Sequence, residues 1–123
     1  MKENIIKIKS FEFAIRIVKL FQHLQSEKKE FILSKQLLRS GTNPGAMVRE
    51  AEHSQSKADF IHKLSIAQKE INETIYWLEL LSATDYLTQK EFESINNDAI
   101  EIIKLITSII KTTKTNINNK NNG

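Results

Sequence analysis

The sequence contains no cysteine, one proline and three glycines among its 123 residues. The lack of cysteine excludes disulfide frameworks, thiolate zinc sites and cysteine nucleophiles, and it is typical of proteins in a reducing compartment. The shortage of turn-forming residues argues against a β-sandwich. No run of about 20 apolar residues is present, so we predict a cytoplasmic protein without a signal peptide, a transmembrane helix or a membrane partner.

Apolar residues make up 40% of the chain and charged residues 27%, a composition typical of a globular helical protein. A chain of this length fits one domain that buries roughly two thirds of the surface exposed by its unfolded form. Residues 10–114 are predicted to form this domain. Residues 1–9 are predicted to be an N-terminal extension, and residues 115–123, which are rich in Asn, a disordered tail.

The charges are segregated along the chain, although the net charge is a modest +3. Residues 1–49 carry ten Lys and Arg against four Asp and Glu, residues 50–101 carry four against eleven, and residues 102–123 carry four against none. In a folded bundle this pattern gives basic and acidic faces that suit anion binding or contacts between subunits. The alternative is that these are ordinary solvated faces.

The first amphipathic segment runs from about Ser10, a favourable N-cap residue, to Gln25. Its apolar face covers about half of the helix circumference, which is wider than one partner helix needs. This face contains Phe13, Ile17, Leu20 and Leu24, with Phe11, Ala14, Val18 and Phe21 beside them. Arg16 and Lys19 lie on the remaining polar arc and are predicted to face solvent or a polar partner.

Two later segments begin with helix caps and continue with apolar residues at alternating spacings of three and four. Ser56 and Asp59 resemble a capping pair, and Thr88 and Glu91 form a standard capping box. The predicted inward residues are Phe60, Leu64, Ala67, Ile71, Thr74, Leu78 and Leu81, followed by Phe92, Ile95, Ala99, Ile102, Ile106 and Ile109. The short connection over residues 82–87 makes these helices antiparallel neighbours, and the pattern predicts an all-α four-helix bundle.

The outer side of the third predicted helix carries Ile66, Trp77 and Leu80 among charged residues. An exposed Trp with two aliphatic residues is more than a monomeric bundle needs, so we predict a contact between subunits at these positions. The alternative is that a neighbouring loop partly covers them.

The segment between residues 34 and 54 is ambiguous because Gly41, Pro44 and Gly45 interrupt a helical pattern. In a helix interior a proline costs about 3 kcal/mol and a glycine about 1 kcal/mol. One interpretation is two helices, the second starting with Asn43 as N-cap and Pro44 at its first position. The interpretation that we favour is one helix, kinked near Pro44, in which Gly41 and Gly45 let another helix approach closely.

We predict no metal, no cofactor and no catalytic residues. Glu50 with His53, and Asp59 with His62, have the spacing of di-iron ligands, but the first helix adds no inward carboxylate. A capping role explains Asp59 better. No phosphate-binding loop, nucleophile elbow or zinc-protease motif is present.

A basic surface is the main indication of a nucleic-acid partner. Phosphate contacts tolerate variation in the exact position of the cations, so clustered Lys and Arg suffice for affinity without sequence specificity. No motif that reads base edges is present. The candidate contact residues are Arg16, Lys19, Arg39, Arg49 and Lys57.

Several stretches, taken in order, resemble one family. They are Phe11-Glu-Phe-Ala-Ile-Arg-Ile-Val-Lys-Leu, Leu37-Leu-Arg-Ser-Gly-Thr, Val48-Arg-Glu-Ala-Glu, Ser56-Lys-Ala-Asp-Phe-Ile-His-Lys-Leu-Ser-Ile-Ala and Asn72-Glu-Thr-Ile-Tyr-Trp-Leu-Glu-Leu-Leu. From about Ile5 to Lys111 the chain is similar to the four-helix bundle proteins that include the 23S rRNA intervening-sequence proteins. The stretch Asn43-Pro44-Gly45-Ala46-Met47 departs from the Ser-Ile-Gly-Ala-Asn that is usual in that family.

The resemblance implies an antiparallel, up-and-down bundle, a homopentameric ring and no enzymatic activity. A similar bundle serves as the accessory protein of diversity-generating retroelements and is thought to bind nucleic acid and a nucleic-acid-processing enzyme. Carried over, this implies that Arg16, Lys19, Arg39 and Arg49 contact RNA and that the patch around Trp77 is a ring interface.

Two functional hypotheses follow from the sequence. The first is a non-enzymatic homo-oligomer that binds structured RNA or a ribonucleoprotein through its basic surface. The alternative is a protein–protein interaction adaptor without nucleic-acid binding. A metal-dependent bundle enzyme is the third and least supported possibility.

Overall fold

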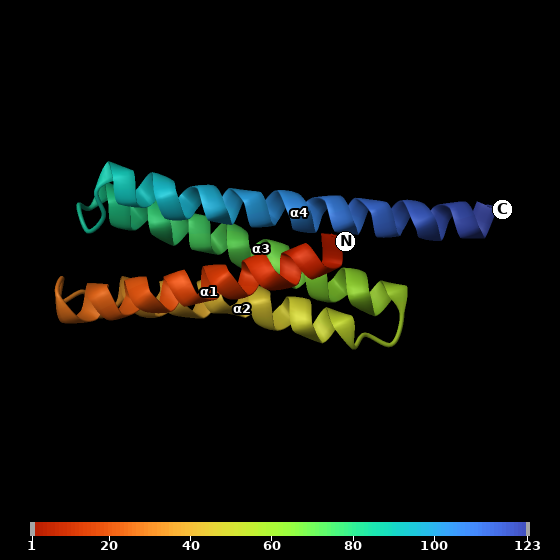
Figure 1. Cartoon of the computed structure of the whole chain (residues 1–123), viewed down its shortest axis with the longest axis horizontal. Helices are drawn as coiled ribbons and strands as arrows, with labels where there is room; N and C mark the ends of the chain where they lie inside the picture. Colours follow the sequence, from red (N-terminus) through yellow and green to blue (C-terminus); the bar gives the residue numbers. More distant parts are fainter. Residues whose placement is uncertain (1, 123) are drawn as a thin grey trace.

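The computed structural model describes residues 2–122, with side chains described for residues 4–118. It contains four helices: α1 (Lys2–Ser26), α2 (Leu33–Glu52), α3 (Lys57–Ala83) and α4 (Gln89–Asn122), as Figure 1 shows. None of the described residues forms a strand. The predicted all-α four-helix bundle is therefore confirmed.

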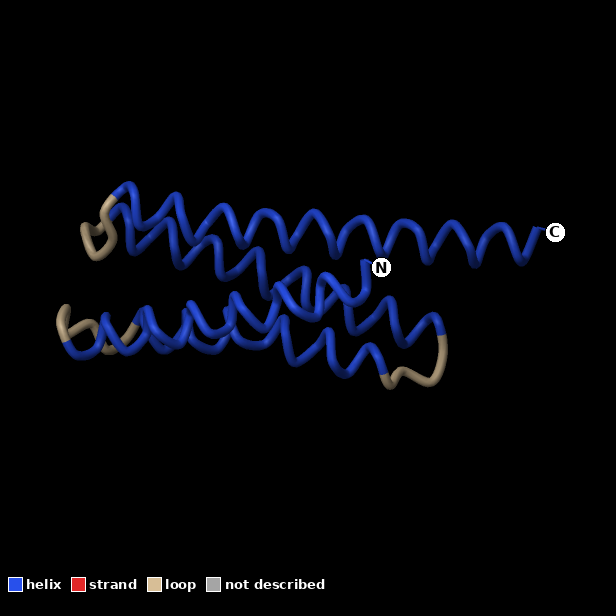
Figure 2. The backbone as a smooth tube through the Cα atoms, in the orientation of Figure 1, coloured by secondary structure: helices blue, strands red, loops and turns tan. Residues whose placement is uncertain are grey.

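The helices are arranged so that neighbours in sequence are neighbours in space. Each helix packs against the next one along the chain, and α1 also packs against α4. The α1–α2 and α3–α4 loops lie at one end and the α2–α3 loop at the other, while the end of α4 projects beyond the N-terminus of α1 (Figure 2). The helices enclose an apolar, mostly aliphatic core that includes Phe13, Ile17, Leu24, Leu37, Leu64, Ile71, Leu78, Leu81, Ile102 and Ile106.

The ends of α1 and α4 differ from the sequence-based expectation. Helix α1 begins at Lys2 and not near Ser10, and Ser10 is buried inside it, with its hydroxyl 3.3 Å from the Lys7 carbonyl oxygen. Ile6 is 2% exposed and belongs to the core, so packing extends the helix into the predicted extension. Residues 115–122, which we expected to be disordered, continue α4. Neither of these two segments contains a residue that stops a helix. Extending an existing helix also needs no new nucleus, because each added residue forms one more backbone hydrogen bond.

The predicted caps of α3 and α4 are present. The Asp59 N–H donates to the Ser56 hydroxyl oxygen at 3.0 Å, and the Gln55 N–H donates to the Asp59 carboxylate at 3.4 Å. At the start of α4 the Glu91 N–H donates to the Thr88 hydroxyl at 3.1 Å, and the Thr88 N–H donates to the Glu91 carboxylate at 2.8 Å. These contacts satisfy backbone donors that have no partner within the first turn of a helix.

Helix α2 is one helix with Pro44 buried inside it, so the interpretation as two helices is wrong. The expected close approach of another helix at its glycines is confirmed, and that helix is α1. A Cβ atom added at Gly41 would lie 2.7–2.9 Å from three side-chain carbons of Ile17. One added at Gly45 would lie 3.4 Å from the Ser10 carbonyl oxygen. The kink near Pro44 stays a prediction.

Glu30, in the α1–α2 loop, caps helix α2 from outside it. Its carboxylate accepts the backbone N–H groups of Ile32, Leu33 and Ser34 at 3.1, 2.9 and 2.6 Å. The Glu30 side chain has little contact with solvent, since the residue is 7% exposed. Burial by itself raises the pKa of Glu30, but the three N–H groups together lower it below its ordinary value.

We predict that Gly41→Ala destabilises the protein and that Gly45→Ala does not. The methyl group at residue 41 overlaps Ile17, which costs about 1–3 kcal/mol by overpacking. The methyl group at residue 45 finds ordinary van der Waals contact, so the higher helix propensity of alanine leaves stability equal or up to about 1 kcal/mol greater. Urea denaturation of the two variants tests this, and equal stabilities would contradict it.

We also predict that Glu30→Gln lowers the free energy of unfolding by about 1–2 kcal/mol near neutral pH, because the amide loses the charge-assisted hydrogen bonds. The folded pKa of Glu30 is lowered, so its contribution is complete above the unfolded value of about 4.3. That contribution is lost as the pH falls through the folded pKa. Denaturation curves of the two proteins should therefore converge in acid, and a constant difference at all pH values would refute the assignment.

Candidate nucleic-acid interface

A groove of about 530 Å³ lies between α1 and the start of α4 and is open to solvent. Its floor is apolar, and its rim carries three permanent cations, Arg16, Lys19 and Lys90. The floor consists of Leu20, Leu87 and Ile95, and the rim includes Arg16, Lys19, His23, Lys90, Glu91 and Ser94. The residues from α1 and those from α4 are each spaced three and four apart, so each set lies along one edge of its helix.

Arg16 is fixed at the groove by α4. One of its guanidinium nitrogens donates to the Asp98 carboxylate at 2.6 Å and also lies 3.3 Å from the Ser94 carbonyl oxygen. The other donates to the Ser94 hydroxyl at 3.0 Å. Arg16 therefore contributes a positioned donor whose charge is largely offset by Asp98.

Lys19 and Lys90 stand on opposite walls of the groove, and both are exposed. Neither makes a hydrogen bond or an ion pair with any residue whose side chain is described. A lysine ammonium group is a mobile point charge with three donors, and it suits phosphate oxygens. These two residues are the unpaired cations of the groove.

Glu91 is the one acid among the lining residues, and it is committed to the capping box. The backbone N–H and the hydroxyl of Thr88 lower the pKa of Glu91, with smaller contributions from the nearby His23 and Lys28. The carboxylate is therefore ionised at neutral pH and already holds the start of α4. It does not pair with Lys19 or Lys90.

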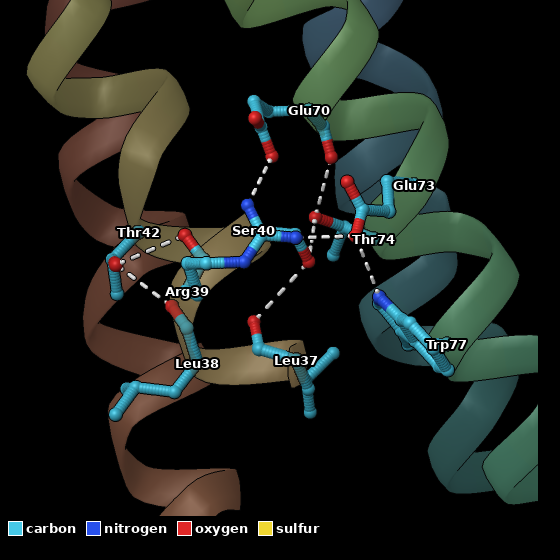
Figure 3. Close-up of polar contacts among 9 residues, drawn as sticks. All are labelled: Leu37, Leu38, Arg39, Ser40, Thr42, Glu70, Glu73, Thr74 and Trp77. Atoms are coloured by element: carbon cyan, nitrogen blue, oxygen red, sulfur yellow. Dashed lines mark hydrogen bonds and ion pairs between the residues drawn. The ribbon is translucent and has the colours of Figure 1, made fainter. Parts of the chain in front are cut away.

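Arg39 is not in the groove but on the face formed by α2 and α3 (Figure 3). Its guanidinium donates to Glu70 at 3.1 Å and to Glu73, which also accepts the Trp77 indole N–H at 3.2 Å. Beneath it, the Thr74 hydroxyl lies 2.8 Å from the Glu70 carbonyl oxygen and 3.0 Å from the Ser40 hydroxyl. Two carboxylates thus neutralise Arg39.

The remaining predicted cations lie near the α2–α3 loop. The Arg49 guanidinium sits over the Phe11 ring, 5.1 Å from its centroid, and Lys57 is the exposed first residue of α3. The structure therefore brings Arg16 and Lys19 together and places Arg39, Arg49 and Lys57 elsewhere. Sequence reasoning missed Lys90 and His23 as site residues. The sequence showed on which side of its helix each of these residues lies. It did not show that this part of α1 packs beside the start of α4.

The predicted subunit contact residues Ile66, Trp77 and Leu80 are each half-buried. Trp77 packs against the core and meets the Tyr76 ring edge-on at 5.1 Å between centroids. The interface stays a prediction. The most exposed large apolar side chains in the part of the chain with described side chains are Ile5, Ile8, Phe11, Ile15, Val18, Phe31, Ile32 and Tyr76.

The two carboxylates considered as metal ligands have other partners. Glu50 pairs with Lys63 at 3.1 Å, and Asp59 accepts a backbone N–H at the start of α3. Over the residues with described side chains, no group of three or more His, Asp and Glu is placed to hold a metal ion. Within the same part of the chain, every helix is too short or too polar to cross a membrane.

Comparison with known proteins gives a family. The sequence profile described as 23S rRNA-intervening sequence protein matches residues 2–108. The chain belongs to this family. A comparison with curated proteins finds no match.

A solved structure similar to this 23S rRNA-intervening sequence family member is a protein of unknown function from the S23 ribosomal protein family of Bacteroides thetaiotaomicron VPI-5482. The two are 63% identical, with a TM-score of 0.90, and the match covers 90% of this chain and 99% of the other. The resemblance stated from the sequence is therefore confirmed at the level of family and fold.

Proposed function

We propose that this family member is a non-enzymatic, homo-oligomeric protein that binds structured RNA, alone or within a ribonucleoprotein, through the α1–α4 groove. The observation that carries the proposal is the pair of unpaired lysines, Lys19 on α1 and Lys90 on α4, that line one groove with an apolar floor. Each lysine that contacts a phosphate releases condensed counterions, which supplies affinity without a base-specific contact. The family name supports RNA as the polyanion.

The floor of the groove adds a second reason for RNA. Leu20, Leu87 and Ile95 offer apolar surface between the two cationic walls. Loops and bulges of RNA expose bases that have left the helical stack, and such bases can meet protein surface while the backbone follows basic groups. A groove with a cationic rim and an apolar floor fits an irregular RNA segment. In this proposal the protein acts in the cytoplasm. The expected assembly is a pentamer, and native mass spectrometry of the purified protein measures the number of subunits.

A protein–protein adaptor without nucleic-acid binding is the second candidate, favoured by the exposed apolar residues on α1 and at Phe31 and Ile32. Affinity purification with and without nuclease separates the two. Proteins that stay bound after nuclease treatment, together with no RNA binding in low salt, would favour the adaptor.

We predict that the double variant Lys19→Gln/Lys90→Gln binds structured rRNA fragments about tenfold or more weakly at low salt. Its plot of log affinity against log salt should be shallower by about two units, one for each lost phosphate contact. Filter binding across a salt series measures both quantities. Lys104→Gln/Lys111→Gln is the matched control, because it removes the same two charges at exposed positions of α4 that do not line the groove.

The two doubles together make the test decisive. A large loss in the groove double with a small loss in the control supports the groove. Equal losses in both would show diffuse binding and contradict it. If the wild-type protein does not bind RNA at low salt, the function itself is wrong.

We further predict that Asp98→Asn strengthens RNA binding, because it removes a negative charge and releases the Arg16 guanidinium for a phosphate. The salt slope should steepen by about one unit. Stability should change by less than about 1 kcal/mol, since the ion pair is exposed to solvent. Weaker RNA binding by this variant would contradict the role given to Arg16.

A further inference from the structure

Helix α1 carries a second apolar stripe on the side that faces away from the core. The stripe comprises Ile5, Ile8, Phe11, Ile15 and Val18, which are 42%, 58%, 52%, 41% and 37% exposed. From Ile8 onward the spacing alternates between three and four residues. This is the spacing of a seam that packs against another helix, and no helix of the same chain covers it.

The stripe is large enough to indicate an interface. Its side chains together expose roughly 400 Å², which is about the size of the largest apolar patch on a typical monomer. Patches of this size are often functional. A standard interface covers about 800 Å² on each partner, so polar residues at the edges of the stripe must also take part. Arg49 supplies one such edge, since its guanidinium lies against the ring of Phe11.

The outer face of α3 offers a complementary surface on the same molecule. An exposed row with the same alternating spacing runs along it: Lys69, Asn72, Tyr76, Glu79 and Ala83. Tyr76 is 55% exposed, and Asn72 and Ala83 are smaller exposed side chains on either side of it. Residues 70–87 contain four acids and no Lys or Arg. Of these acids, Glu79 makes no ion pair with any residue whose side chain is described.

We propose that the α1 stripe of one subunit packs on the α3 row of a second copy, with Arg49 paired to Glu79 across the contact. This inference rests on the homo-oligomer in the proposed function and names the surfaces that form it. The two surfaces differ, so the contact is head-to-tail, and copies joined in this way close into a ring when the rotation between them allows. Arg49 then serves subunit association and not RNA, while Lys19 and Lys90 stay free in the groove.

Two full-length variants test the pairing, each with one surface damaged. Ile15→Lys places a charge in the stripe, and Tyr76→Glu places one in the α3 row. Both residues are exposed, so circular dichroism should show folded bundles. Sedimentation velocity should find each variant monomeric by itself. Mixed together they should form a one-to-one dimer and nothing larger, because each retains the surface that the other lacks.

Controls keep the result open to contradiction. Ile32→Lys, which alters a 76% exposed loop residue outside both surfaces, should assemble like the wild type. Val18→Lys replaces the stripe variant if Ile15→Lys does not fold. Assembly of the stripe variant at wild-type size would overturn the role of the stripe. Assembly of Tyr76→Glu at wild-type size would overturn the pairing and point to contact between two stripes.

The outcome is separable from the proposed function. A monomeric wild-type protein would overturn both the homo-oligomer and this interface. An assembled wild-type protein with an equally assembled stripe variant would overturn the interface alone. The monomeric stripe variant, measured at equal subunit concentration, should still bind RNA through the groove. Its plot of log affinity against log salt should have the slope expected for the phosphate contacts of Lys19 and Lys90 in one subunit.

Discussion

The contact between Ile17 of α1 and Gly41 of α2 is the constraint on which the surfaces of this protein depend. Because Gly41 has no Cβ, Ile17 packs directly against the α2 backbone, and this contact turns one side of α1 inward. An α-helix has 3.6 residues per turn, so the direction of Ile17 fixes the direction of every other side chain on α1. Lys19 and His23 therefore lie toward α4, and Ile15 and Val18 point outward. The groove and the apolar stripe are thus two consequences of one packing contact.

Pairing within the bundle then decides which charges remain available. Lys7 pairs with Glu52 at 3.2 Å, Lys9 with Glu101 at 2.8 Å and Lys63 with Glu50 at 3.1 Å. Such exposed pairs add little to stability, but they neutralise charge that would otherwise attract a polyanion. The net charge of +3 is therefore less informative than the positions of the few cations without a carboxylate partner.

The sequence predicted the core seams well because aliphatic spacing records burial directly. Sequence-based prediction was less successful where a residue that suits one role has a different one in the structure. Ser10 is a favourable N-cap residue, but it lies buried in the interior of α1 next to α2. Two of the three permanent cations that line the candidate groove could be named from the sequence. Arg16 and Lys19 share an edge of α1 by their spacing, whereas the neutralisation of Arg39 depends on Glu70 and Glu73 of α3, and helix phase alone does not reveal that pairing.

The most direct test of this account is a nuclear Overhauser experiment on the wild-type protein in solution. The close approach of α1 and α2 predicts strong cross-peaks between the Ile17 methyl protons and the Gly41 Hα protons. Their presence, together with no contact from the Ile15 or Val18 methyl groups to core residues of α3 or α4, would establish the phase of α1. Cross-peaks from Gly41 to Ile15 or Val18 in place of Ile17 would contradict it, and with it the placement of both the groove and the stripe.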